Sequence, residues 1–146
     1  MKAGSIFLIF LLLFSCQKPA DRACWKGAGN VVKQQVPFES FEFLHIYPHM
    51  KVVLIQDSLD YVEWEANENL MNFLEAEKAL DTLILRNHNR CRFLRYRKEQ
   101  VTVKVHFTAL QQILFENSDT VKTAGIWQQN ELEFILKEGA GMINLE

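Results

Sequence analysis

The chain has 146 residues, of which 49% are hydrophobic and 23% are charged. With 11 Phe, 3 Trp and 3 Tyr it can build a packed core, and with only 6 Gly and 3 Pro it is not a disordered stalk. A formal net charge of −2 excludes a protein that binds nucleic acid through overall basicity.

The chain begins with a secretion signal. Lys2 provides a positive charge, residues 6–14 (IFLIFLLLF) are continuously apolar, and the small residue Ser15 follows. This apolar run is too short for a membrane-spanning helix, which needs about 20 residues. We therefore expect residues 1–15 to be removed on secretion.

Cys16 directly follows the small residue, and Leu13-Phe14-Ser15-Cys16 resembles the bacterial lipobox. The resemblance implies that Cys16 is lipidated and that residues 16–23 form a lipidated tether. Two or more acyl chains anchor a protein stably, because each buried CH₂ contributes about 0.8 kcal/mol. Gln17, where an aspartate would mark the inner membrane, resembles an outer-membrane address. We expect the protein on the periplasmic or cell-surface face of that membrane.

Two cysteines remain after the tether, Cys24 and Cys91. In an oxidising compartment such a pair favours a disulfide. It would close a loop of about 68 residues and contribute about 4 kcal/mol in the chain-entropy model. The alternative is two buried free thiols.

Six segments of the first two thirds have the β-branched content or the alternation of strands. The first ends at Pro37 and is a candidate edge strand. The last alternates valines and Phe107 with polar residues, which predicts a solvated His106. The six segments are 31–36, 41–46, 51–56, 61–66, 82–86 and 101–107.

Residues 67–80 allow two interpretations. Asn67 can cap a short helical turn through Leu70 and Met71. From there the spacing of the apolar residues fits either a helix continuing to Leu80 or a hairpin, and both alternatives stay open.

The last third contains a weak repeat. A shift of 22 residues aligns Ile113 with Ile135, Leu114 with Leu136 and Val121 with Ile143. Such a period predicts stacked β rungs, as in a solenoid. The sequence ends at 141–146 within a predicted strand and without a polar cap, so we expect it to be truncated at the C-terminus.

Several segments, taken in order, resemble the auto-transporter adhesin head GIN domain family of Bacteroidetes lipoproteins. The resemblance covers residues 24–146 and implies an all-β fold, a right-handed β-helix or β-roll-like solenoid, of which this chain holds an incomplete copy. The matching segments include Gly29-Asn30-Val31-Val32, Phe38-Glu39-Ser40-Phe41, KVVLIQ, EANENL, NHNRCRFLR and Val101-Thr102-Val103.

Charges are unevenly distributed. Residues 57–81 contain eight acids and one lysine, whereas residues 86–98 contain only basic charges. One interpretation is a patch for an anionic partner, because arginine suits phosphate and carboxylate; its members are Arg90, Arg92, Arg95, Arg97 and Lys98. The other is that the basic and acidic segments pair across neighbouring strands, each pair contributing less than about 1 kcal/mol.

No catalytic constellation or cofactor motif stands out. Glu63 and Glu65 share a strand face at about 6.5 to 7 Å, which permits glycoside cleavage but is typical of plain surface. His45 and His49 have a helical metal spacing, but Pro48 argues against a helix, so we expect no metal. The tryptophans favour core positions over a sugar-stacking platform; they are Trp25, Trp64 and Trp127.

These features predict a non-catalytic lipoprotein of the cell envelope, held to the membrane by its lipid. Its expected role is adhesion, or binding of a glycan or an envelope protein, without nucleic acid. The alternatives are a polysaccharide-active β-helix enzyme and a purely structural lipoprotein.

Overall fold

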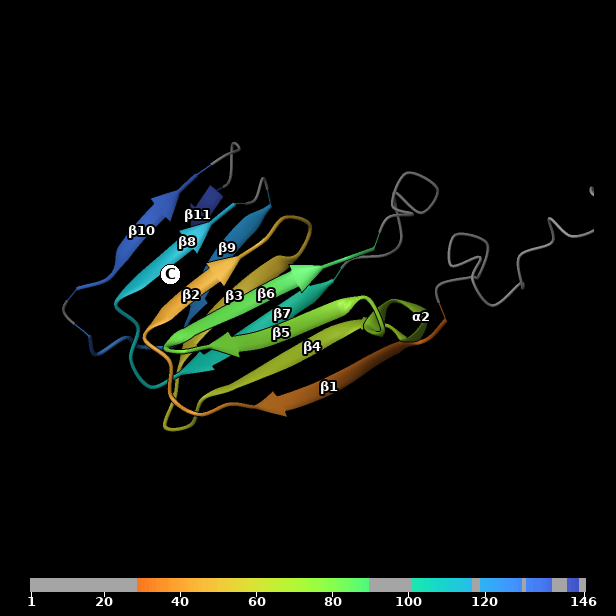
Figure 1. Cartoon of the computed structure of the whole chain (residues 1–146), viewed down its shortest axis with the longest axis horizontal. Helices are drawn as coiled ribbons and strands as arrows, with labels where there is room; N and C mark the ends of the chain where they lie inside the picture. The colour runs from red at the N-terminus through yellow and green to blue at the C-terminus, as the bar shows by residue number, and fades with distance from the viewer. Residues whose placement is uncertain (1–28, 90–100, 117–118, 130, 138–141, 145–146) are drawn as a thin grey trace, which may run out of the picture.

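The structure is a computed structural model, and it describes residues 29–89, 101–116, 119–129, 131–137 and 142–144. Two β-sheets lie face to face, one of six strands and one of five (Figure 1). In chain order the elements are β1 (Val31–Pro37), β2 (Phe43–Ile46), β3 (Lys51–Gln56), β4 (Tyr61–Asn67), α2 (Glu68–Met71), β5 (Leu74–Ala79), β6 (Thr82–Asn87), β7 (Thr102–Phe107), β8 (Gln112–Phe115), β9 (Thr120–Ala124), β10 (Glu133–Leu136) and β11 (Met142–Asn144).

Both sheets are mixed. The six-stranded sheet has the order β1-β4-β7-β3-β9-β11, with antiparallel pairs at β1–β4 and β4–β7 and parallel pairs beyond. The five-stranded sheet has the order β10-β8-β2-β6-β5, and its one antiparallel pair is β5–β6. β1 lies at a sheet edge, as its sequence predicts.

The prediction of an all-β fold is confirmed, but the prediction of a β-helix or solenoid is wrong. In a solenoid each coil stacks on the one before it in the chain. Here β7 lies between β4 and β3, and β2 lies between β6 and β8, so spatial order departs from chain order. A hairpin at Leu80 also reverses the chain, which adds the antiparallel pair. The sheets stay open, with an edge strand on each side.

The 22-residue repeat corresponds to parallel strand pairs rather than to coils. Val121 pairs with Ile143 as the repeat predicts. Ile113, however, pairs with Phe134 and not with Ile135, a shift of 21 residues. Because a slip of one residue turns a side chain to the other face, Phe134 packs against the core and Ile135 points outward.

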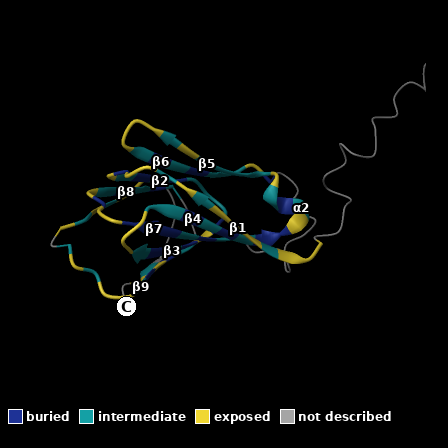
Figure 2. Cartoon of the chain, turned by 90° about the horizontal axis from the view of Figure 1, so that it is seen from below, coloured by how far each residue is buried: buried dark blue, intermediate teal, exposed yellow. Residues whose placement is uncertain are grey.

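The hydrophobic core lies between the two sheets (Figure 2). The alternation of the strands fills it: Leu44 and Ile46 of β2 and Val103 and Val105 of β7 all belong to the core and are fully buried. Phe41, which lies before the start of β2 at Phe43, is buried too.

The short α2 covers one end of the sandwich (Figure 2), with Leu70 fully buried. Asn67 is the N-cap residue, yet its side chain donates to the carbonyl of Gly29 at 3.1 Å instead of capping the helix. After α2 the chain forms the β5–β6 hairpin, so the hairpin alternative for residues 67–80 is correct. Among the described residues no helix is long and apolar enough to cross a membrane.

Candidate binding surface

The five-stranded sheet has an outer face that no described element covers (Figure 1). Side chains point outward at every second position of its strands, so the parallel register aligns them in rows across the sheet. We call these residues the five-stranded outer face; they are Phe43, His45, Tyr47, Glu75, Glu77, Ile84, Arg86, Gln112, Leu114, Glu116, Glu133, Ile135 and Lys137.

Arg86 lies near one end of the row that crosses the sheet from Glu75 to Lys137. Its Nη1 lies 3.0 Å from Oε2 of Glu77 and 3.4 Å from Oε2 of Glu75. The hydrogen bond that Arg86 donates to Glu77 is the main cause that raises the pKa of Arg86. The guanidinium also lies 5.3 Å from the ring centroid of Tyr47, a cation–π distance. These contacts fix Arg86 across three strands.

The row continues from Tyr47 toward β10. The rings of Tyr47 and His45 are stacked with centroids 4.4 Å apart. Nε2 of His45 lies 3.2 Å from Oε1 of Glu116, which also accepts a hydrogen bond from Nζ of Lys137 at 3.0 Å. Lys137 is the largest cause that lowers the pKa of Glu116, and His45 adds to it. A continuous set of polar and aromatic contacts therefore crosses all five strands.

Apolar side chains lie beside this row. Phe43, Ile84 and Leu114 are half-buried, and Ile135 is 37% exposed. Leu114 is the register partner of His45, and Ile84 is its partner on the other side. The face thus combines an apolar strip with a strip of preorganised polar groups.

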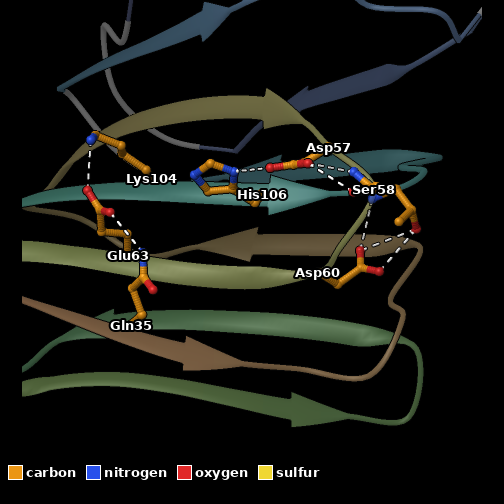
Figure 3. A network of polar contacts seen from close by, with 8 residues as sticks. Gln35, Asp57, Ser58, Asp60, Glu63, Lys104 and His106 are labelled. Atoms are coloured by element: carbon orange, nitrogen blue, oxygen red, sulfur yellow. Dashed lines mark hydrogen bonds and ion pairs between the residues drawn. The ribbon is translucent and has the colours of Figure 1, made fainter.

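The outer face of the six-stranded sheet has a different network (Figure 3). Nδ1 of His106 lies 2.9 Å from Oδ2 of Asp57, and the ring of Tyr61 is stacked on that of His106 with centroids 3.9 Å apart. The hydrogen bond from His106 is the main cause that lowers the pKa of Asp57. His106 is buried, so the prediction that it is solvated is wrong; Tyr61 covers it.

Lys104 and Glu63 form the second part of that network. Nζ of Lys104 donates to Oε1 of Glu63 at 2.7 Å, and Nε2 of Gln35 donates to Oε2 at 3.2 Å (Figure 3). The bond from Lys104 is the main cause that lowers the pKa of Glu63. Glu65 is paired with Lys33 at 3.2 Å. A general acid needs a raised pKa, so the lowered pKa of Glu63 does not suit it to the role of general acid in glycoside cleavage.

The Asp57–His106 pair resembles the acid and base of a catalytic triad. Across the described ranges the structure gives Nε2 of His106 no hydrogen bond to a hydroxyl or thiol nucleophile. Asp57 instead fixes the turn between β3 and β4, and Asp60 of the same turn accepts from the backbone N–H of Thr108 at 2.9 Å. The network therefore holds the turn between β3 and β4 against β7 and Thr108.

The two outer faces differ in charge. The six-stranded face carries Lys33, Lys51, Lys104 and Lys122 against Asp57, Glu63 and Glu65. The five-stranded outer face carries four glutamates against Arg86 and Lys137. One face is thus net basic and the other net acidic.

The site residues predicted from the sequence lie outside the described residues. These are the lipidation site Cys16, the cysteines Cys24 and Cys91, and the basic patch Arg90, Arg92, Arg95, Arg97 and Lys98. Only Arg86 of the basic segment is described, and its pairing with Glu75 and Glu77 agrees with the charge-pairing interpretation. The disulfide and the anionic-partner patch stay predictions.

The aromatic platform predicted as an alternative does not involve Trp64, which is 3% exposed in the core. Trp127 is half-buried and packs edge-on against Phe107 with ring centroids 5.3 Å apart. In the described part of the chain no three or more His, Cys, Asp or Glu residues cluster as a metal site would require. The sequence does not predict an outward Tyr47, because Tyr47 follows the predicted end of its strand.

The sequence profile described as "Putative auto-transporter adhesin, head GIN domain" matches residues 40–146. The chain belongs to this family. The resemblance seen in the sequence segments is thereby confirmed. The comparison with curated proteins gives no match.

Three solved structures are similar to this head GIN domain chain. A putative adhesin from Bacteroides fragilis has a TM-score of 0.66 at 11% identity, over 80% of this chain and 53% of that one. A putative adhesin from Parabacteroides merdae has a TM-score of 0.59 at 14% identity, over 74% of this chain and 44% of that one. A putative lipid binding protein from Parabacteroides distasonis has a TM-score of 0.50 at 13% identity, over 66% of this chain and 42% of that one. At these identities the likeness concerns the fold, and the chain spans about half the length of these relatives.

Proposed function

We propose that the chain is a non-catalytic adhesion module of the bacterial outer membrane, and that it binds its partner through the five-stranded outer face. The observation that carries the proposal is the continuous row of contacts from Glu75 to Lys137. Side chains that hold one another in place lose little entropy on binding. Membership of an adhesin family supports the same conclusion.

An adhesion assay tests this function. Cells that display the full chain are measured for attachment to surfaces coated with mucin or with polysaccharide. Tyr47→Ala removes the centre of the row and should reduce attachment to the level of cells without the protein. Lys122→Glu, on the opposite face, should leave attachment unchanged. Equal attachment by the parent and the Tyr47 variant would assign binding to another surface.

Anchoring is proposed to occur through lipid at Cys16, after removal of residues 1–15 and with 16–23 as the tether. Three acyl chains would hold the domain at the membrane far more firmly than one. Cys16→Ala should move the protein from the membrane fraction to the soluble fraction or block its processing. An intact-mass measurement of the parent should show the acyl groups, and a mature chain of unmodified mass would contradict the anchor.

A disulfide between Cys24 and Cys91 is proposed to close the domain formed by residues 24–146. A thiol assay on denatured, unreduced protein decides between this bridge and two free thiols. We expect no titratable thiol in the mature lipidated chain. Two titratable thiols would exclude the disulfide.

The basic patch from Arg90 to Lys98 is proposed as a second binding site, for anionic partners. The triple variant Arg92→Ala, Arg95→Ala, Arg97→Ala should lose binding to vesicles that contain anionic lipid, provided that Cys16→Ala is present so that the anchor does not bind them. Undiminished binding by this variant would remove the patch from the candidate sites.

A further inference from the structure

The five-stranded outer face has charges that select among ligands. Glu75, Glu77 and Glu116 are each in contact with Arg86 or Lys137, so both cations of the face are already neutralised. Glu133 accepts a hydrogen bond from the Gln112 amide at 2.6 Å and no cation of the face is paired with it. The surplus charge is negative, and an acidic ligand would be repelled.

A dry protein–protein contact is also a poor match for this face. The centre of a protein interface is depleted in charged residues. Here the charged pairs Arg86–Glu77 and Lys137–Glu116 lie on either side of the central Tyr47. Burying them under a second protein would require the desolvation of several charges, which costs more than the pairs return.

A glycan can contact both the apolar side chains and the carboxylates of this face. The C–H side of a sugar ring packs on aliphatic and aromatic side chains, which Phe43, Ile84, Leu114 and Ile135 supply. Its hydroxyls and any amine donate to carboxylates, and the oxygens of Glu116 and Glu133 are held ready at the edge of the apolar strip. Rows that run across the strands provide both kinds of contact at successive positions.

On these grounds we propose that the five-stranded outer face binds a glycan chain without acidic groups, aligned across the strands, and that it favours amine-bearing sugars. The inference rests on the proposed binding function of the same face and adds the class of ligand. Glu133 is the residue that excludes acidic glycans, because its charge is not balanced by a cation of the face.

The test uses the purified full chain in detergent and three oligosaccharides of equal length immobilised on a sensor. The chain carries Arg92→Ala, Arg95→Ala and Arg97→Ala, so that the basic patch does not bind the acidic ligand. They are a neutral N-acetylglucosamine oligomer, its de-acetylated cationic form, and an acidic oligogalacturonate. We expect the cationic form to bind most tightly, the neutral form next, and the acidic form at least about fivefold more weakly than the neutral one, consistent with one or two surface charges.

Two charge reversals provide the matched comparison. Glu133→Lys should lower the affinity for the cationic oligosaccharide about fivefold and raise the affinity for the acidic one by about the same factor. Lys122→Glu changes an exposed residue of the opposite face and should leave the affinity for all three oligosaccharides unchanged. Circular dichroism of both variants confirms that they fold. Acidic binding equal to or tighter than neutral binding, or no binding to any of the three, overturns the inference.

The outcome also separates the inference from the proposed function. If Tyr47→Ala abolishes cell attachment while no oligosaccharide binds, the face is an adhesion surface and its ligand is not a glycan. If Tyr47→Ala leaves cell attachment intact and no oligosaccharide binds, both the proposed function and the inference about its ligand fail.

Discussion

At the scale of single residues, ion pairs on the outer faces hold neighbouring strands in register. The pair Lys104–Glu63 joins β7 to β4, and its Glu63 side chain is only 15% exposed. Contact with Lys104 lowers the pKa of Glu63, and contact with Glu63 is the main cause that raises the pKa of Lys104. The pair therefore stabilises the folded state between the acid range where Glu63 gains its proton and the alkaline range where Lys104 loses its own.

Lys104→Met should lower the free energy of unfolding at pH 7 by about 1 kcal/mol, a value reduced for the partial exposure of the lysine. A carboxylate with a lowered folded pKa loses its contribution as the pH falls through that pKa, so the difference between parent and variant should shrink at pH 3. Urea denaturation at both pH values measures it. Lys122→Met, at an exposed lysine of the same face, is the control and should change neither value; a constant difference at pH 3 and 7 would contradict the assignment.

Trp127 offers a second test of residue chemistry. Its ring packs on Phe107, while its Nε1 is buried and has no hydrogen-bond partner among the described residues. Trp127→Phe keeps the edge-on contact and removes an unsatisfied donor, so its cost should stay below about 1 kcal/mol. Trp127→Ala loses the contact and should cost about 3 kcal/mol. Equal losses in urea denaturation would show that the indole nitrogen has a partner.

At the scale of elements, local sequence predicts strands well and their pairing poorly. The valines of β3 and β7 indicate strands because alternation and β-branching are local signals. The contact between His45 and Glu116 joins residues 71 positions apart, and it depends on the insertion of β2 between β6 and β8. No local pattern encodes that insertion, which explains why the strands were predicted and the outer-face row was not.

The β5–β6 hairpin carries a local strain that can be measured. Leu80 has a φ of 55°, a left-handed conformation that is unfavourable for a bulky residue, and its side chain is 92% exposed. Leu80→Gly should therefore raise the free energy of unfolding by about 0.5 kcal/mol, the relief of strain less the entropy that glycine adds to the unfolded chain.

A second leucine-to-glycine change provides the control for the hairpin. Leu59 is exposed in the turn between β3 and β4, and its φ is not positive. Leu59→Gly relieves no strain and should lower the free energy of unfolding by about 0.5 to 1 kcal/mol. Thermal or urea denaturation compares the two, and a stability change of the same sign in both variants would contradict a strained Leu80.

At the scale of the whole molecule, the sandwich has protected and unprotected edges. β1 ends in Pro37 and exposes Lys33, and β5 carries the charged residues Glu75, Glu77 and Lys78, so both edges discourage further pairing. β10 presents Ile135 and Leu136, which are 37% and 45% exposed, at the opposite edge of its sheet. β10 is therefore an edge of the five-stranded sheet at which a further strand can add.

Self-association of the purified full chain should therefore run through β10. Ile135→Lys places a charge on this edge and should lower the apparent mass by light scattering at high protein concentration, because a charged edge resists strand addition. Ile126→Lys is the matched control, since Ile126 is 87% exposed but lies outside any strand. If both variants reduce association equally, general hydrophobicity drives it and the β10 edge has no special role; if neither does, association uses another surface.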